Sequence, residues 1–166
     1  MGLCTPGRYL RSVTQLDPEA LWASGKRALL LDRDNTLVPR DTSVMPDDVV
    51  AWLARARDRG FSLCIVSNNW AKNVRSDAQA IGAALVSRAA KPLPFALWHA
   101  LRKLGARRHE AVLVGDQVFT DILGARLAGI DSVLVVPQSD VDLKGGLALR
   151  GLEERVLRGL SPEEDR

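Results

Sequence analysis

The residues best suited to chemistry are polar side chains that follow short apolar runs. One run ends in Asp32-Arg33-Asp34-Asn35-Thr36, the next in Ser67-Asn68-Asn69, and a later one in Gly115-Asp116, with Asp121 shortly after. Lys91 follows another such run. Carboxylates that converge repel one another unless a cation offsets them, and hard oxygen ligands suit Mg²⁺. The spacing therefore predicts an acidic site that binds magnesium.

The same side chains favour phosphoryl transfer. A carboxylate can act as a covalent nucleophile and form an aspartyl-phosphate, while a second carboxylate transfers protons. Such a reaction depends on positioning and on stabilisation of charge, which magnesium, Lys91, the Ser67 hydroxyl and backbone amides near Asn68 can supply. We expect the helix that follows Asn69 to present its positive end to a phosphate.

Elements that position these residues follow from the hydrophobic pattern. Helical periodicity alternates with apolar runs of strand length, and strands separated by single helices run parallel with right-handed crossovers. The pattern predicts a doubly wound α/β fold, a three-layer α/β/α sandwich with a parallel five-stranded sheet. Its site lies beyond the carboxyl ends of the strands. The predicted strands are 27–31, 61–66, 83–86, 111–114 and 132–136.

The helices between these strands have clear ends. Each predicted helix is followed by a glycine, which favours the left-handed backbone of a helix C-terminus. These glycines are Gly60, Gly82, Gly105 and Gly129.

A length of 166 residues fits one domain. We expect a core over residues 27–137, preceded by a helical lead-in over 1–26. In the lead-in, Asp17-Pro18 opens a short helix that Gly25 closes. Residues 140–166 are predicted to form an amphipathic helix, Leu149 to Leu160, and a charged tail.

Composition narrows the functional class. The chain is 46% hydrophobic and 26% charged with a net charge of +3, and its basic residues form no long block. This favours an ordinary globular protein and gives no strong nucleic-acid signal. Cys4 and Cys64 lack the spacing of a disulfide framework or a zinc site. No run reaches the length of a membrane span or a signal peptide, so we expect a cytoplasmic protein.

Four motifs in order resemble the haloacid dehalogenase (HAD) superfamily: Asp-x-Asp-x-Thr, Ser-Asn, Lys, and Gly-Asp with a second Asp. The resemblance implies that Asp32 is the nucleophile and Asp34 the general acid and base. It also implies that Ser67 and Lys91 bind phosphate and that Asp116 binds the metal.

The implied Mg²⁺ ligands are the Asp32 carboxylate, the Asp34 backbone carbonyl and the Asp116 carboxylate, with Asp121 supporting Asp116 or the metal. One departure from the superfamily pattern is Arg33, which stands where an apolar residue is usual. Its guanidinium can reach phosphate or pair with a neighbouring acid.

A closer resemblance, to the capless subfamily IIIA and its YqeG family, runs from Thr5-Pro6 to about Pro137. It is carried by Leu-Asp-Arg-Asp-Asn-Thr-Leu-Val-Pro, Ile-Val-Ser-Asn-Asn, Arg-Ala-x-Lys-Pro and Val-Gly-Asp-Gln-x-x-Thr-Asp. That family is similar to mitochondrial phosphatidylglycerophosphate phosphatases, which implies a lipid phosphate as a candidate substrate.

The spacing of the motifs leaves no room for a cap domain, so we expect an open site and a bulky substrate. A phospholipid head group fits that expectation. Trp70, the loop 38–45 and the C-terminal helix are candidates for peripheral contact with the inner membrane face.

Other interpretations stay open. The same site chemistry permits a phosphatase for nucleotides, sugar phosphates or nucleic-acid ends, and a phosphate cradle without catalysis can serve a regulatory binding module. Taken singly, Ser67 to Asn69 can be a helix cap, Lys91 a solvated charge, and Asp116 a turn residue. Their joint order favours the enzyme.

Overall fold

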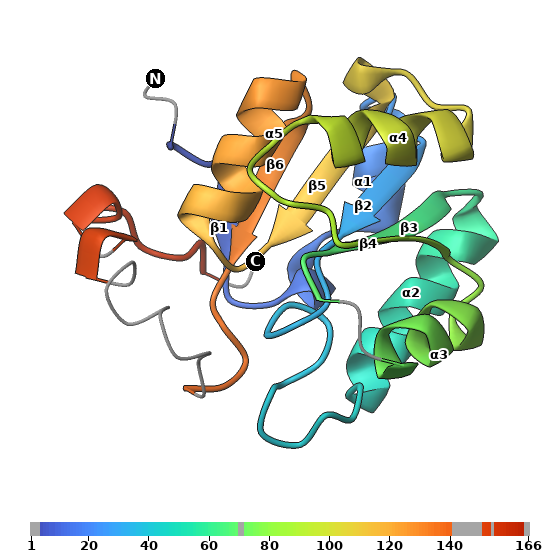
Figure 1. The fold of residues 1–166 in the computed structure, drawn as a ribbon, viewed down its shortest axis with the longest axis horizontal. Coiled ribbons are helices and arrows are strands. Elements are labelled where there is room, and N and C mark those ends of the chain that lie inside the picture. The colour runs from blue at the N-terminus through green and yellow to red at the C-terminus, as the bar shows by residue number, and fades with distance from the viewer. Residues whose placement is uncertain (1–3, 70–71, 141–150, 154, 165–166) are drawn as a thin grey trace.

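The computed structural model describes residues 4–69, 72–140, 151–153 and 155–164 (Figure 1). The chain forms a parallel sheet with helices on both faces. The strands are β1 (Arg8–Leu10), β2 (Ala28–Leu31), β3 (Ser62–Ser67), β4 (Ala84–Ser87), β5 (Ala111–Gly115) and β6 (Asp131–Val135). The helices are η1 (Val13–Gln15), α1 (Pro18–Ala23), α2 (Asp47–Arg59), α3 (Lys72–Ala80), α4 (Phe95–Leu104), η2 (Arg108–Glu110), η3 (Val118–Ile122) and α5 (Leu123–Ala128).

Strand order in the sheet is β1-β6-β5-β2-β3-β4, and every pair is parallel. The order reverses at β2, which lies between β5 and β3. In an open α/β sheet this reversal leaves a crevice at the carboxyl ends of the strands. The strands β2 and β5, which Asp32 and Asp116 follow, and β3, which ends at Ser67, are adjacent in this order.

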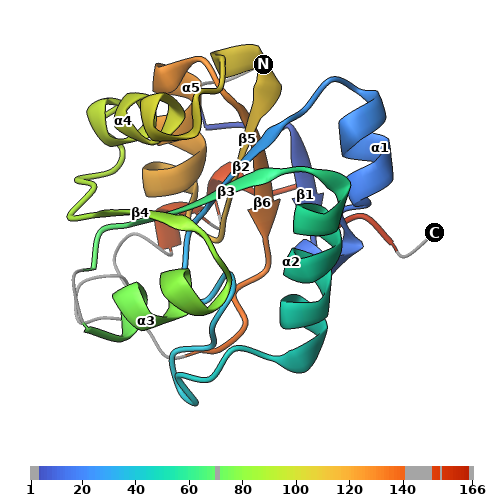
Figure 2. The ribbon, with the colours of Figure 1, turned by 90° about the vertical axis from the view of Figure 1, so that its right-hand side faces the viewer.

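Each face of the sheet has its own hydrophobic core, because successive strand residues point to opposite sides. Leu29 and Leu31 of β2 pack in one cluster with residues of α2 and α3, whereas Ala28 and Leu30 pack in the other with residues of α4 and α5. Figure 2 shows α4 and α5 on one side of the strands and α1 and α2 on the other. The predicted three-layer arrangement is confirmed.

The predicted number of strands was too low. β1 adds a sixth strand, pairing Arg8 with Val133 and Leu10 with Val135 at the edge of the sheet. It is only three residues long, and of these only Leu10 is buried. So short a strand shows no hydrophobic period, which is why the sequence predicts a purely helical lead-in over residues 1–26.

Helix ends agree closely with the predictions. The Asp17 side chain accepts a hydrogen bond from the Glu19 amide at the start of α1. Gly60, Gly105 and Gly129 end α2, α4 and α5 in the left-handed conformation. The helix predicted between strands 111–114 and 132–136 begins differently, because η3 is a π-helical turn that precedes α5. Such π-helical turns are rare in proteins as a whole, and those that occur are often found at functional sites.

The C-terminal helix ends earlier in the sequence than predicted. Leu149 lies outside the described residues; 151–153 and 155–156 are helical, and the helix ends before Leu157. Gly159, at φ 91°, and Pro162 beyond it disfavour continuation. Leu157 packs against the small cluster of Val118, Ile122 and Leu134. The segment therefore docks on η3.

Among the described residues, no helix combines the length and apolarity needed to cross a bilayer. Between β2 and β3 these residues form one loop and α2, and between β4 and β5 they form α4 and η2. Neither connection holds an inserted domain, as the motif spacing predicted.

Candidate active site

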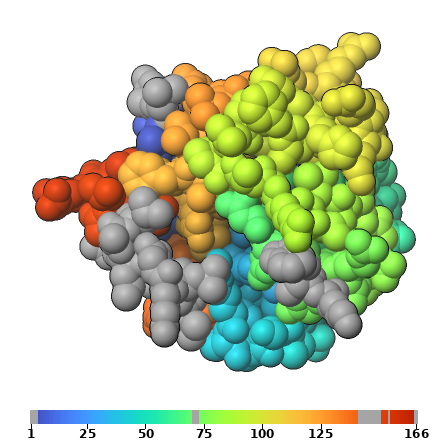
Figure 3. All heavy atoms as spheres, in the orientation of Figure 1, coloured from blue at the N-terminus to red at the C-terminus, as the bar shows by residue number. Residues whose placement is uncertain are grey.

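A cleft of about 370 Å³ lies beyond the carboxyl ends of the strands. In Figure 3 the segments after β2 (light blue) and at the end of β3 (green) meet later parts of the chain (yellow to orange) on this face. The cleft brings together five of the predicted site residues with four others. Its lining is Asp32, Asp34, Arg40, Ser67, Asn68, Asn69, Lys91, Gln117 and Thr120.

Lys91 connects the nucleophile candidate to a second acid. Its ammonium Nζ donates to Asp32 Oδ1 and to Asp121 Oδ1, each at 2.6 Å, and its side chain is only 2% exposed. Burial alone lowers the pKa of Lys91, but Asp121 and Asp32 outweigh it, and the net shift is upward. Lys91 is therefore a fixed positive charge in the site.

Asn68 positions the backbone of Lys91. The Lys91 amide donates to Asn68 Oδ1 at 2.8 Å, and Asn68 Nδ2 donates to the Lys91 carbonyl at 3.3 Å. This pair of hydrogen bonds ties the end of β3 to the segment after β4. The side chain of Asn68 thus has a structural partner, and any phosphate contact at this residue falls to the backbone.

Three carboxylates gather around this ammonium. Oxygens of Asp32, Asp116 and Asp121 lie within 4.8 Å of one another, and all three residues are buried. Burial raises the pKa of Asp32 to about 6, with Lys91 opposing that shift and Asp121 adding to it. Burial, and then the charge of Asp32, raise the pKa of Asp116 well above its usual range. One lysine does not offset three acids.

The donor set fits a divalent metal with hard oxygen ligands. Asp121 already accepts from Lys91 and, through Oδ2, from the Gln117 amide at 3.2 Å. Asp116 has a weaker contact, from the Thr36 hydroxyl at 3.3 Å. Asp32 and Asp116 are therefore better placed to bind a cation than Asp121, whose two carboxylate oxygens already accept hydrogen bonds from Lys91 and Gln117.

Comparison with known proteins decides the family. A model of the haloacid dehalogenase-like hydrolases matches residues 14–129, more than half of the chain. The chain belongs to this family. The probable phosphatase YqeG of Bacillus subtilis (strain 168) is 29% identical over 155 residues, which cover 93% of this chain and 90% of that protein. The predicted HAD superfamily is confirmed, and the similarity to the Bacillus subtilis protein supports the predicted resemblance to the YqeG family and the predicted enzyme class, a HAD-type phosphatase.

Solved HAD structures share the fold. A cobalt-bound deoxy-D-mannose-octulosonate 8-phosphate phosphatase of Haemophilus influenzae gives a TM-score of 0.56 at 13% identity, covering 81% of this chain and 89% of that chain. A HAD phosphatase of Thermococcus onnurineus gives 0.53 at 19% identity, covering 82% and 99%. At these identities the likeness supports the α/β fold class alone.

The turn after β2 shapes the HAD motif. Asn35 is fully buried with φ at 60°, a left-handed conformation that asparagine tolerates better than most residues. Its side-chain oxygen accepts from the Arg40 amide at 3.2 Å and from the Ser139 hydroxyl at 2.7 Å. This turn aims Asp34 into the cleft and lets Thr36 reach Asp116.

Asp34 is held through both of its carboxylate oxygens. Oδ1 accepts from Arg33 Nη1 at 2.6 Å, and Oδ2 faces Asn69 Nδ2 at 3.4 Å. The Ser67 hydroxyl accepts from the Asn69 amide at 3.0 Å. Arg33 thus pairs with a neighbouring acid, one of the two roles considered for it, and it does not line the cleft.

Four residues of the cleft were not predicted. Asn69 and Gln117 stand next to motif residues, so their positions follow from the motifs once the strands are known. Thr120 belongs to the quoted motif Val-Gly-Asp-Gln-x-x-Thr-Asp but was given no role there. Arg40 gave no signal, because a lone arginine in a loop is common. Only the folded loop and the π-helical turn bring Arg40 and Thr120 to the cleft.

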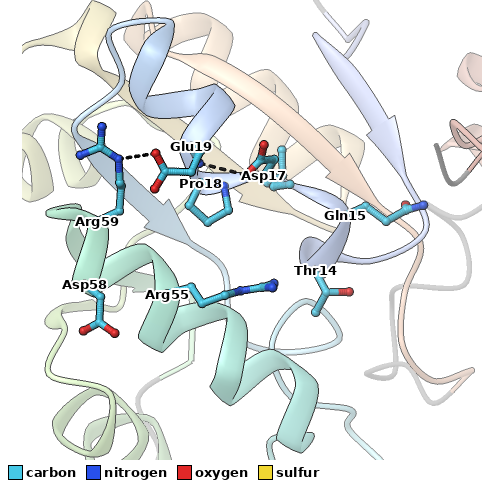
Figure 4. A pocket seen from close by; sticks show the side chains of 9 residues that line it. Thr14, Gln15, Asp17, Pro18, Glu19, Arg55, Asp58 and Arg59 are labelled. Atoms are coloured by element: carbon cyan, nitrogen blue, oxygen red, sulfur yellow. Dashed lines mark hydrogen bonds and ion pairs between the residues drawn. The ribbon is translucent and has the colours of Figure 1, made fainter.

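A second cleft, of about 670 Å³, lies between η1, α1 and α2 (Figure 4). Its charged side chains include Arg59, whose Nε pairs with Glu19 Oε2 at 2.7 Å, and Asp17, which caps α1. None of the predicted site residues lines it. The motif residues therefore belong to the cleft at the carboxyl edge.

Gly115 allows Asp121 its position. A Cβ atom at residue 115 would overlap the Asp121 carboxylate. We expect Gly115→Ala to displace Asp121 from Lys91 and to lower the free energy of unfolding by ~1–3 kcal/mol. Urea denaturation measures this, with Gly151→Ala as control because a Cβ atom there meets nothing within 4 Å. Equal stability of the two variants would contradict the close packing.

Proposed function

We propose that the protein is a magnesium-dependent phosphomonoester hydrolase that forms an aspartyl-phosphate intermediate on Asp32. The observation that carries this proposal is the position of Asp32 in the cleft. Lys91 holds its Oδ1, and Asp34 lines the same cleft two residues later. A carboxylate fixed by a cation beside a second, separately held carboxylate suits a nucleophile and a general acid and base.

Both halves of the proposed reaction use these residues. First, an Asp32 oxygen bonds to phosphorus while the ester P–O bond breaks, and Asp34 gives its proton to the leaving oxygen. Then water bonds to phosphorus while the bond to Asp32 breaks, and Asp34 takes the proton of that water. Inorganic phosphate leaves and both carboxyl groups return to their first state. Lys91, the Ser67 hydroxyl and backbone amides near Asn68 would bind the phosphoryl oxygens.

Magnesium would be held by the Asp32 and Asp116 carboxylates and the Asp34 backbone carbonyl, with Asp121 in a supporting position. When bound, the cation would offset negative charge on the acids and on the phosphate. The excess of buried carboxylates over ammonium groups supports this part of the proposal.

The proposed substrate is bulky, and phosphatidylglycerophosphate is the named candidate. The resemblance to phosphatidylglycerophosphate phosphatases and the absence of an inserted cap domain in the described connections support it. Arg40 adds a cation to the lining of the cleft. A substrate with a second anionic group beyond its phosphomonoester, such as a phosphodiester, can use that cation.

Peripheral contact with the cytoplasmic face of the inner membrane would follow from a lipid substrate. Apolar side chains are exposed on segments next to cleft residues: Leu93 and Phe95 follow Lys91 and are 52% and 67% exposed, and Val44 is 67% exposed in the loop after Arg40. Such side chains suit an interface. The predicted contact residue Trp70 lies outside the described residues. We expect flotation with anionic liposomes; absence from the lipid fraction would contradict this contact.

Phosphate release tests reaction and substrate together. We expect the protein to hydrolyse phosphatidylglycerophosphate with Mg²⁺, and Asp32→Asn to lower kcat by roughly a thousandfold or more because the nucleophile is gone. Nucleotides, sugar phosphates and 5′-phosphorylated oligonucleotides complete the panel.

The control is Asp58→Asn, which removes an exposed acid of α2 and should keep full activity. Activity on soluble esters but not on the lipid would leave the proposed mechanism in place and rule out phosphatidylglycerophosphate as the substrate. Inactivity on every substrate would favour the alternative, a regulatory module that binds phosphate. Full activity in Asp32→Asn would contradict the assigned nucleophile.

Metal binding has a readout apart from activity. We expect about 5 mM Mg²⁺ to raise the melting temperature of the native protein by about 2–4 °C, since a ligand that binds only the folded state stabilises it. Asp116→Asn should lose this shift. In metal-free buffer it should melt no lower than the native protein, because a repelled buried acid is removed. An equal Mg²⁺ shift in both proteins would rule out Asp116 as a ligand.

A further inference from the structure

Arg33 is a buried charge without an obvious structural need. It is 3% exposed, and its Nη2 has no hydrogen-bond partner within the part of the chain that the structure describes. Burying a guanidinium is costly, and an apolar side chain of similar volume often gives equal or greater stability. Arg33 thus serves something other than the core.

Two carboxylates from different elements share its guanidinium. Nη1 donates to Asp34 Oδ1 and Nε donates to Asp77 Oδ2, each at 2.6 Å. Asp77 lies on α3, and its side chain is 25% exposed. The guanidinium fork therefore bridges α3 to the turn after β2 and does not pair with one acid alone.

The bridge determines the orientation of the Asp34 carboxylate. With Oδ1 taken by Arg33, the oxygen on which Asp34 can carry a proton is Oδ2, which faces Asn69 across a long 3.4 Å contact. The planar guanidinium is held by Asp34 and by Asp77, so it fixes the direction of its bond to Oδ1 better than a freely rotating ammonium would. Proton transfer depends strongly on such positioning.

We propose that Arg33 and Asp77 are positioning residues that direct Oδ2 of Asp34 toward the leaving oxygen of the substrate. This inference rests on the proposed function, in which Asp34 protonates that oxygen as the ester P–O bond breaks. Arg33 contacts Asp34 and not the cleft, and Asp77 contacts Arg33, so both act through Asp34.

The test compares two phosphate esters with different leaving groups. An alkyl ester such as glycerol 3-phosphate needs its leaving oxygen protonated, whereas the dinitrophenolate of 2,4-dinitrophenyl phosphate leaves without a proton. The value of kcat/KM reports only the steps up to the first irreversible one, here transfer of the phosphoryl group to Asp32. A residue that positions the acid affects kcat/KM for the alkyl ester selectively.

We expect Arg33→Met to lower kcat/KM for glycerol 3-phosphate by roughly 30-fold or more and that for the dinitrophenyl ester by less than about threefold. Asp77→Asn should act in the same direction, by roughly three- to tenfold on the alkyl ester, because Arg33 keeps its bond to Asp34. Arg33→Lys should fall between the native protein and Arg33→Met.

Matched controls are Arg75→Met, on the exposed side of α3, and Asp58→Asn, on α2. Both should leave the two kcat/KM values unchanged. Circular dichroism and melting temperature check the fold; if Arg33→Met does not fold, the partly exposed Asp77→Asn decides.

Equal losses on both esters, or no loss on either, would overturn the positioning role and leave the phosphatase intact. A native protein inactive on both esters and on phosphatidylglycerophosphate, or activity that survives in Asp32→Asn, would remove the proposed function and this inference with it. The two failures are therefore distinguishable.

Discussion

The paired contact of Lys91 with Asp32 and Asp121 is the interaction on which the site depends. Three buried carboxylates repel one another, and the Lys91 ammonium is the positive charge that two of them share at 2.6 Å. It fixes one oxygen of the nucleophile candidate and holds Asp121 away from the cleft. The remaining repulsion among Asp32, Asp116 and Asp121 is what makes a divalent cation a fitting partner.

Several distant segments are needed to maintain this contact. Asn68 at the end of β3 holds the Lys91 backbone, and Gly115 leaves space for Asp121 on the π-helical turn η3. The C-terminal segment supports the same turn, since Glu153 Oε1 accepts from the Val118 amide at 2.8 Å and from the Phe119 amide at 3.4 Å. A carboxylate at the start of a helix also interacts favourably with its dipole. The site thus depends on residues as far along the chain as Glu153.

The site is predictable from the sequence because its residues follow buried strands, whose apolar runs are easy to recognise. Parallel strands bring their carboxyl ends to one edge, so the motifs place Asp32, Ser67 and Asp116 at that edge. The sheet order, with β2 between β5 and β3, then makes them neighbours. The features that sequence patterns miss have the opposite character. β1 is too short for a period, Arg40 reaches the cleft only through a folded loop, and η3 departs from the regular helical repeat. The partner of Arg33, Asp77, lies 44 residues away on another element, and no local pattern connects the two.

The most direct test of the central claim is detection of the phosphorylated enzyme. Asp34→Asn, which slows hydrolysis of the intermediate by removing its general base, is mixed with Mg²⁺ and 2,4-dinitrophenyl phosphate, whose leaving group needs no proton from Asp34. The reaction is quenched in acid and analysed by peptide mass spectrometry. The account predicts one added phosphoryl group on the peptide that contains Asp32, lost on treatment with hydroxylamine. Steady phosphate release with no phosphoryl group on Asp32, or with the group on another residue, would contradict it.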